Sequence, residues 1–131
     1  MRILGIDYGT KRIGVALSDE KAEFAMPYSV IENNSYAMRN VIDLCQKNSV
    51  TEVVFGESTN YDGSDNKVML HIREFADQFT RASKIPVVFE PEFFSSKQAE
   101  RDIGKDELYD ARAAAIILQS YLDKQRYARM A

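Results

Sequence analysis

The chain has 131 residues, of which 45% are hydrophobic and 28% are charged, as is ordinary for a globular protein. This length suits one domain with a sizeable core and excludes two lobes, so we expect a single domain over residues 1–131. The formal net charge of −3 excludes a global positive field, so a nucleic-acid partner would need a local basic patch or metal ions.

The chain has too few cysteines and histidines for disulfide, zinc or nucleophilic chemistry. Cys45 is the single cysteine and excludes an internal disulfide, while His71 is the single histidine and leaves zinc sites and Ser-His or Cys-His catalysis without partners. No apolar run approaches membrane-spanning length, and the chain starts directly with a strand pattern instead of a charged-then-apolar leader. We therefore expect a cytoplasmic protein without a membrane partner.

The first hairpin is expected within residues 3–19, where two apolar runs flank a short turn. Gly9 allows the chain to reverse sharply, which leaves Asp7 at the end of a buried central strand. An Asp two residues before a Gly is most often a turn former. Because open α/β sheets bind ligands outside the carboxyl ends of their strands, a functional role for Asp7 is the stronger interpretation.

The remaining elements follow from hydrophobic spacing and turn signals. A third strand is expected over residues 23–31, with Pro27 best placed at an edge. Helices are predicted after a cap at residues 33–35, around residues 68–79, from residue 95 or 96 to 103 and over about 107–127, with strands at 53–55 and 86–89 between them. Hairpins followed by βαβ crossovers indicate an α/β fold, a mixed sheet flanked by helices with the first strand central.

This topology gathers acidic residues at one rim of the sheet, defined by the carboxyl ends of the first, fourth and fifth strands. The rim would carry Asp7, Glu57, Glu90 and Glu92, and Asp110 in the first turn of the last helix would point toward it. Clustered carboxylates repel one another unless a cation is present, and such clusters usually hold Mg²⁺ or Mn²⁺. Two such ions can hydrolyse a phosphodiester. Taken singly, each carboxylate is more often structural. The helix dipole stabilises an acidic residue such as Asp110 in the first turn of a helix, and Glu90 or Glu92 could simply be solvated at the rim.

Lys11 and Arg12 beside the turn could bind a phosphate of a nucleic acid, although an exposed Lys-Arg pair is more often solvated surface.

The motifs resemble those of the YqgF (RuvX) family of Holliday-junction-resolvase-like proteins, which are regarded as nucleases of pre-16S ribosomal RNA. Residues 3–16 (ILGIDYGTKRIGVA) resemble its opening motif, and residues 54–56 with 60–64 (VFG and NYDGS) resemble its central motif. Ala114 with residues 116–123 (IILQSYLD) resembles its final helix. The similarity covers nearly the whole chain.

This resemblance implies a ribonuclease H-like fold with sheet order 3-2-1-4-5 and a metal-dependent nuclease acting on RNA or branched nucleic acid. Carried over by position, the first acidic residue of the family falls on Asp7, the Glu of its Asp-Glu-Arg segment on Glu92, and the Asp that opens its last helix on Asp110.

The chain also departs from the family pattern. Pro91 and Phe93 flank Glu92 where the family has Asp and Arg, and residues 97–112 hold four Lys or Arg against five Asp or Glu in place of a basic loop. Fewer phosphate contacts weaken nucleic-acid binding. Glu57 stands where the family usually has an apolar residue and could add or replace a metal ligand.

The leading hypothesis is an Mg²⁺- or Mn²⁺-dependent endonuclease, with Asp7, Glu92 and Asp110 as catalytic metal ligands, Glu57 as a further candidate ligand, and Lys11 or Arg12 holding a phosphate. The alternative is a ribonuclease H-like module that binds nucleic acid or protein with lost or weak cleavage. An actin-like nucleotide binder is disfavoured, because that fold needs two lobes. The oligomeric state stays open, with a homodimer as one alternative.

Overall fold

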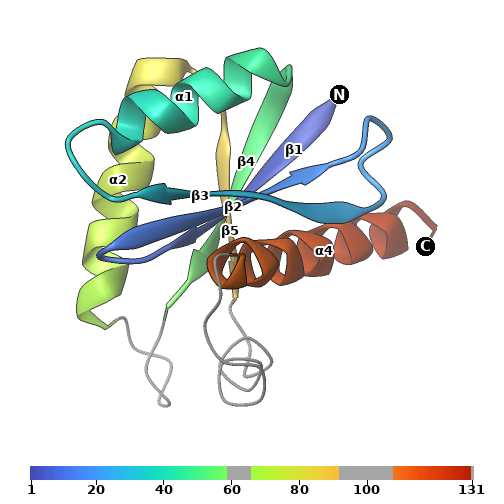
Figure 1. The fold of residues 1–131 in the computed structure, drawn as a ribbon. Coiled ribbons are helices and arrows are strands. Elements are labelled where there is room, and N and C mark those ends of the chain that lie inside the picture. The colour runs from blue at the N-terminus through green and yellow to red at the C-terminus, as the bar shows by residue number, and fades with distance from the viewer. Residues whose placement is uncertain (59–65, 92–107, 131) are drawn as a thin grey trace.

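The computed structural model describes residues 1–58, 66–91 and 108–130. Its elements in chain order are β1 (Arg2–Tyr8), β2 (Arg12–Ser18), β3 (Ala25–Glu32), α1 (Ala37–Lys47), β4 (Val50–Glu57), α2 (Lys67–Ser83), β5 (Val87–Pro91) and α4 (Tyr109–Met130) (Figure 1). The short helix expected to end at residue 103 lies outside the described residues.

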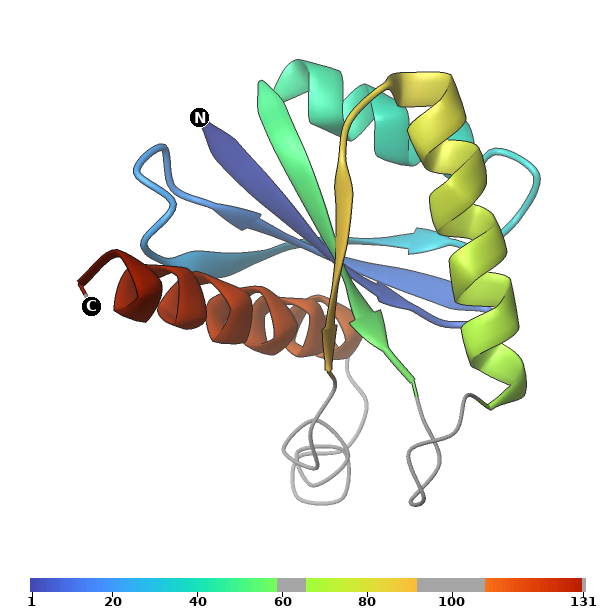
Figure 2. The same ribbon diagram turned by 180° about the vertical axis from the view of Figure 1, so that it is seen from behind.

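The strands form one mixed sheet in the order β3-β2-β1-β4-β5. β1 pairs antiparallel with β2 and parallel with β4, β2 pairs antiparallel with β3, and β4 pairs parallel with β5. The expected strand order and the central place of β1 are confirmed. Figure 2 shows β4 and β5 from behind, with α2 and α4 on opposite sides of the sheet.

Each face of the sheet has its own apolar core because alternate strand residues point to opposite faces. Leu4, Ile6 and Phe55 pack with α1 and α2 on one face, whereas Ile3 and Val54 pack with α4 on the other. Along β1 and β4, residues that face α1 and α2 therefore alternate with residues that face α4. The expected strand and helix types are confirmed throughout the described residues.

Two element starts differ from the sequence expectation, each because a side chain makes a local hydrogen bond. β3 starts at Ala25 instead of residue 23, because the amides of Glu23 and Phe24 donate to Asp19 Oδ1 at 2.8 and 3.0 Å. The amides of Phe24 and then Glu23 lower the pKa of the Asp19 carboxyl. α1 starts at Ala37, after Asn34 Oδ1 accepts from the amide of Tyr36.

α4 lies close to the sheet because small residues face it. A side chain at Gly5 would place a Cβ 2.8 Å from Leu118 Cβ and 3.0 Å from the Ala114 carbonyl oxygen. At Gly56, the same atom would come within 2.6 Å of Ile117 Cδ1. The glycines therefore let the helix pack directly onto β1 and β4.

None of the helices within residues 1–58, 66–91 and 108–130 combines the length and the apolar character needed to cross a lipid bilayer.

Leu118→Ala tests this packing. Leu118 is fully buried against Gly5, so we expect the free energy of unfolding in urea to fall by about 2–5 kcal/mol. Its neighbour Ile116 is 40% exposed, and Ile116→Ala should cost less than about 1 kcal/mol. Equal losses in the two variants would contradict this account of α4.

Candidate metal centre

Asp7 lies near the carboxyl end of β1 on the face that α4 covers. Ile3 packs in the α4 core and Gly5 meets Leu118, so strand alternation gives Asp7 the same face. In the β1–β2 ladder, the partner of Asp7 is Gly14. The expectation that Asp7 lies at the carboxyl end of a central strand is confirmed, although β1 continues one residue further, to Tyr8.

Asp110 is brought to the same place by the start of α4. A Cβ at Gly14 would collide with the backbone carbonyl oxygen of Asp110, so the first turn of α4 rests on the strand residue that pairs with Asp7. The Asp110 side chain is 20% exposed. The carboxylates of Asp7 and Asp110 therefore belong to one corner of the molecule, although they are separated by most of the chain.

The β1–β2 turn beside this corner is fixed by backbone and side-chain hydrogen bonds. The Gly9 amide donates to the Arg12 carbonyl at 2.9 Å, and a Cβ at Gly9 would lie 2.5 Å from that oxygen. Asn33 donates from Nδ2 to the Gly9 carbonyl at 2.8 Å and from its amide to the Lys11 carbonyl at 3.0 Å. Lys11 and Arg12 are thus held exposed in this turn.

Arg12 has a partner that sequence reasoning did not find. Its Nε donates to Asp110 Oδ2 at 2.8 Å, forming an ion pair between a half-exposed guanidinium and a mostly buried carboxylate. The two residues are 98 positions apart. No sequence signal specifies this pair, because it depends on where the first turn of α4 lies on β2.

Glu57 is not brought to the face of Asp7. Phe55 packs toward α1 and α2, and alternation along β4 gives Glu57 that same side. The chain beyond β4 also leads toward α2, where the Ser58 amide meets Met69 Sδ at 3.3 Å and Asn66 Nδ2 donates to Ser58 Oγ at 2.7 Å. The described geometry therefore gives no support for Glu57 as a ligand beside Asp7.

Glu90 is not part of an open acidic rim, and that expectation is wrong. It lies inside β5, is 3% exposed, and its Oε2 accepts from Ser120 Oγ at 2.8 Å and from Lys124 Nζ at 2.6 Å. Ile117 fills the space over Gly56, the ladder partner of Glu90. Glu90 therefore anchors α4 to the edge of the sheet.

A second polar contact ties α4 to β4. Tyr121 donates its hydroxyl to Glu52 Oε1 at 2.8 Å. Burial, followed by this hydrogen bond and the negative charge of Glu52, raises the pKa of Tyr121 to about 12. Polar contacts in the middle of α4 thus attach the helix to β4 and β5, while its first turn carries Asp110 of the candidate site.

Glu92 and residues 60–64 of the central motif lie outside the described residues. Within residues 1–58, 66–91 and 108–130, no three His, Cys, Asp or Glu side chains are grouped in a way that could hold a metal. Asp7 and Asp110, which the backbone places on either side of Gly14, carry hard oxygen donors, the ligand type that suits Mg²⁺ and Mn²⁺. The donor chemistry of Asp7 and Asp110 therefore fits such an ion.

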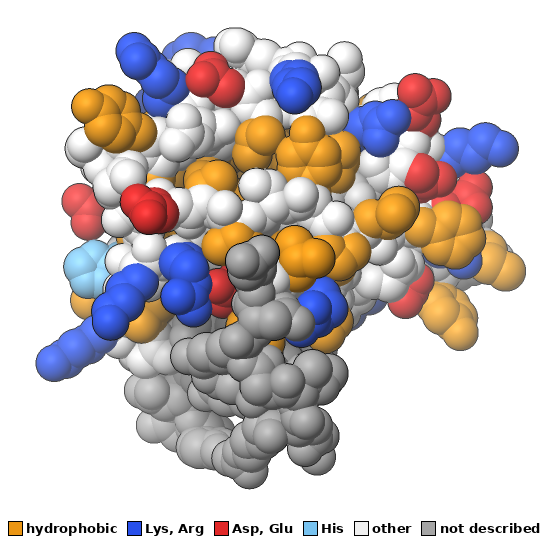
Figure 3. All heavy atoms as spheres, in the orientation of Figure 1, with side chains coloured by type: hydrophobic (Ala, Val, Ile, Leu, Met, Phe, Trp, Pro, Cys, Tyr) orange, Lys and Arg blue, Asp and Glu red, His pale blue; other side chains and the backbone are white. Residues whose placement is uncertain are grey.

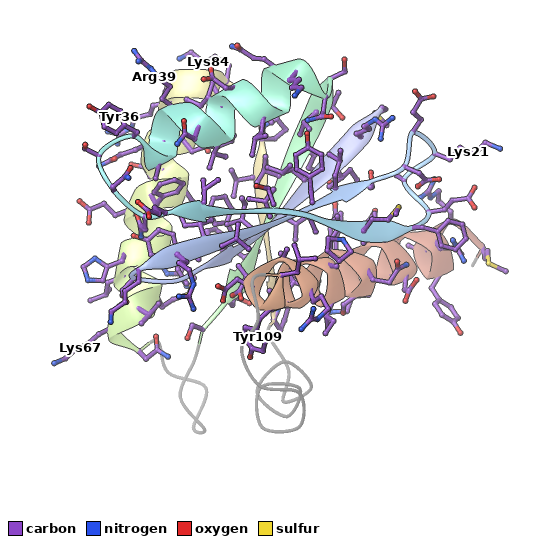
Figure 4. The ribbon with its side chains drawn as sticks, in the orientation of Figure 1. Lys21, Tyr36, Arg39, Lys67, Lys84 and Tyr109 are labelled. Atoms are coloured by element: carbon purple, nitrogen blue, oxygen red, sulfur yellow. The ribbon has the colours of Figure 1, made fainter. Side chains whose placement is uncertain are left out.

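Basic side chains gather around this corner despite the negative net charge. Figure 3 shows Lys and Arg side chains where the β1–β2 turn lies near the start of α2. Figure 4 labels Lys67 at the start of α2 and Tyr109 at the start of α4, on the side of the molecule where β4 and β5 end. Lys67 is exposed and was not singled out from the sequence.

The fold is that of Holliday-junction resolvases, a ribonuclease H-like class. Thermus thermophilus RuvC in complex with a Holliday junction substrate aligns with a TM-score of 0.61 at 19% identity, covering 99% of this chain and 96% of RuvC. The fowlpox virus Holliday junction resolvase aligns with a TM-score of 0.56 at 15% identity, over 95% of this chain and 99% of that one. The expected ribonuclease H-like fold is confirmed.

Proteins of similar sequence identify the family within this fold class. A Syntrophomonas wolfei protein named "Putative pre-16S rRNA nuclease" is 39% identical over 133 residues, covering 94% of each chain. A protein of the same name from Caldanaerobacter subterraneus subsp. tengcongensis is 36% identical, over 96% of this chain and 99% of the relative. The family model described as "RuvX: Holliday junction resolvase" matches residues 1–124. The chain belongs to the RuvX family.

Gly14→Ala tests how α4 is placed at the site. The new Cβ would push against the Asp110 backbone, so we expect a loss of about 1–3 kcal/mol in unfolding free energy together with weaker Mn²⁺ binding in calorimetric titration. Gly5→Ala is the matched control, because it crowds the middle of α4 and should destabilise the fold without changing Mn²⁺ affinity. Mn²⁺ binding that is equally weakened in both would refute a specific role for Gly14.

Glu90→Gln tests the assignment of Glu90 as an anchor. Loss of the charged hydrogen bond with Lys124 should lower the free energy of unfolding by about 1–2 kcal/mol. Mn²⁺ affinity, measured by calorimetry, should match that of the wild type. A large loss of Mn²⁺ binding would return Glu90 to the metal site.

Proposed function

We propose that this chain is a divalent-metal-dependent endonuclease that hydrolyses phosphodiesters in structured nucleic acid. The observation that carries the proposal is the convergence of Asp7 and Asp110 at Gly14, beside a turn that exposes Lys11 and Arg12. Carboxylates next to cations are suited to hold a metal and a phosphate together. Membership of the RuvX family and the resolvase fold support the same activity.

In this proposal Asp7 and Asp110 hold Mg²⁺ or Mn²⁺, and Glu92 completes the ligand set. A bound divalent cation would supply charge stabilisation and nucleophile activation for phosphodiester hydrolysis. Lys11 and Arg12 bind and orient a phosphate of the nucleic acid at the edge of the site. Glu57 is left out of the ligand set, because its place in β4 gives it the α2 side of the sheet.

For the substrate we propose precursor ribosomal RNA, on the strength of the names of relatives that match almost the whole chain. A cytoplasmic location follows from this substrate. Association into a homodimer, as an alternative to a monomer, stays a prediction.

Cleavage assays on structured RNA, including the ends of precursor 16S RNA, and on four-way DNA junctions test the proposal. With Mg²⁺ or Mn²⁺, we expect wild-type cleavage that Asp7→Asn lowers by at least about 100-fold, because a metal ligand is lost. Asp43→Asn, which changes an exposed acidic residue of α1, is the matched control and should retain activity.

Equal cleavage by the wild type and Asp7→Asn would contradict the proposed site. Binding of RNA without metal-dependent cleavage in either protein would instead favour the alternative, a ribonuclease H-like binding module.

A further inference from the structure

We propose that Arg12 is an exchangeable counter-charge: it neutralises Asp110 before metal and substrate bind, and moves to a phosphate of the nucleic acid when Asp110 takes a divalent cation. The inference rests on the proposed function and adds a coupling to it. Metal binding and nucleic-acid binding would strengthen each other through this one side chain.

The starting point is the direct ion pair between Arg12 and Asp110. Arg12 Nε lies 2.8 Å from Asp110 Oδ2, and the Asp110 side chain is 20% exposed while that of Arg12 is 49% exposed. The Arg12 backbone is fixed by the hydrogen bond from Gly9 and by Asn33 across the turn. The guanidinium thus stands on a rigid base while half of its side chain faces solvent, an arrangement that lets it pivot without refolding the turn.

Repulsion explains why a counter-charge is useful here. Asp7 is the ladder partner of Gly14, and the Asp110 backbone rests on the same glycine, so the two acidic residues lie in neighbouring positions. Like charges at one site raise the free energy of the folded state unless a cation is near. Arg12 places a positive charge directly on one of the two carboxylates. It therefore stabilises the site in the absence of metal.

The magnitudes favour exchange over a permanent pair. An ion pair with a half-exposed partner contributes little net free energy, because solvent screens it and holding the side chain costs entropy. A divalent cation carries twice the charge and is shared by several oxygen ligands. Arg12 can then offer its planar guanidinium to a phosphate, which it binds with two parallel hydrogen bonds.

The two binding events would then be linked in both directions. If Asp110 with metal releases Arg12 for phosphate, phosphate on Arg12 must equally favour metal at Asp110, because coupling free energies are reciprocal. Lys11 sits in the same turn and has no ion pair with Asp110 among the described residues. It would contribute charge to nucleic-acid binding without this coupling.

Calorimetric Mn²⁺ titration of the nucleic-acid-free protein gives the first test. We expect Arg12→Gln to bind Mn²⁺ about two- to fivefold more tightly than the wild type, because a competing cation is removed. Lys11→Gln removes the same charge from the same turn. Because Lys11 does not pair with Asp110 and solvent screens its charge, this variant should change the Mn²⁺ affinity less than twofold. Unchanged or weaker Mn²⁺ binding in Arg12→Gln, or an equal gain in both variants, would overturn the exchange.

The second test observes Arg12 itself. The Nε–H signal of Arg12 in a ¹H–¹⁵N NMR spectrum, assigned by its loss in Arg12→Lys, should shift on addition of diamagnetic Mg²⁺ with the midpoint of metal binding. Asp110→Asn should shift this signal before any metal is added. A signal that stays in place at saturating Mg²⁺ would show that Arg12 keeps its partner and would refute the proposal.

Asp7→Asn separates failure of this inference from failure of the proposed function. If Asp7→Asn binds Mn²⁺ as tightly as the wild type, the metal site is wrong and the exchange fails with it. If Asp7→Asn loses Mn²⁺ while Arg12→Gln matches the wild type, the metal site stands and the exchange alone is wrong.

Discussion

The close approach of α4 to the sheet is the constraint on which the candidate site depends. Gly5 and Gly56 let Leu118 and Ile117 reach the strands, and Gly14 lets the first turn of the helix rest on β2. A side chain at Gly14 would push the first turn of the helix off β2 and carry Asp110 away from Asp7. The ion pair of buried Glu90 with half-exposed Lys124 fixes the same helix at the far edge of the sheet. The packing of α4 on the sheet thus determines where the charge of Asp110 lies relative to that of Asp7.

Much of the fold could be predicted from the sequence, because alternation and helical spacing are local signals. The hairpin that presents Asp7, the central place of β1 and the order of the strands follow from such patterns and from the family motifs. The face of Glu57 was also within reach, since Phe55 two residues earlier is an evident core residue. The partners of Arg12 and Glu90 were not, because they depend on how a helix at the end of the described chain lies across the sheet.

The charge distribution gives the protein a local instead of a global attraction for polyanions. The chain is acidic overall, yet basic side chains collect beside the β1–β2 turn and the start of α2. Screening at physiological salt limits such attraction to about 8 Å. A phosphate must therefore come near the turn before it is held, which favours recognition at close range over long-range capture.

The pairing of Arg12 with Asp110 also has a consequence for protein synthesis. The two residues are separated by 98 positions, so a ribosome makes the turn long before it makes the start of α4. Contacts of such long sequence range form late, after the loop between them has closed. A partly synthesised chain therefore carries Asp7 and Arg12 without Asp110, and the candidate site is assembled only after the last helix has left the ribosome. The order of synthesis therefore keeps the candidate site incomplete until the end of the chain has been made.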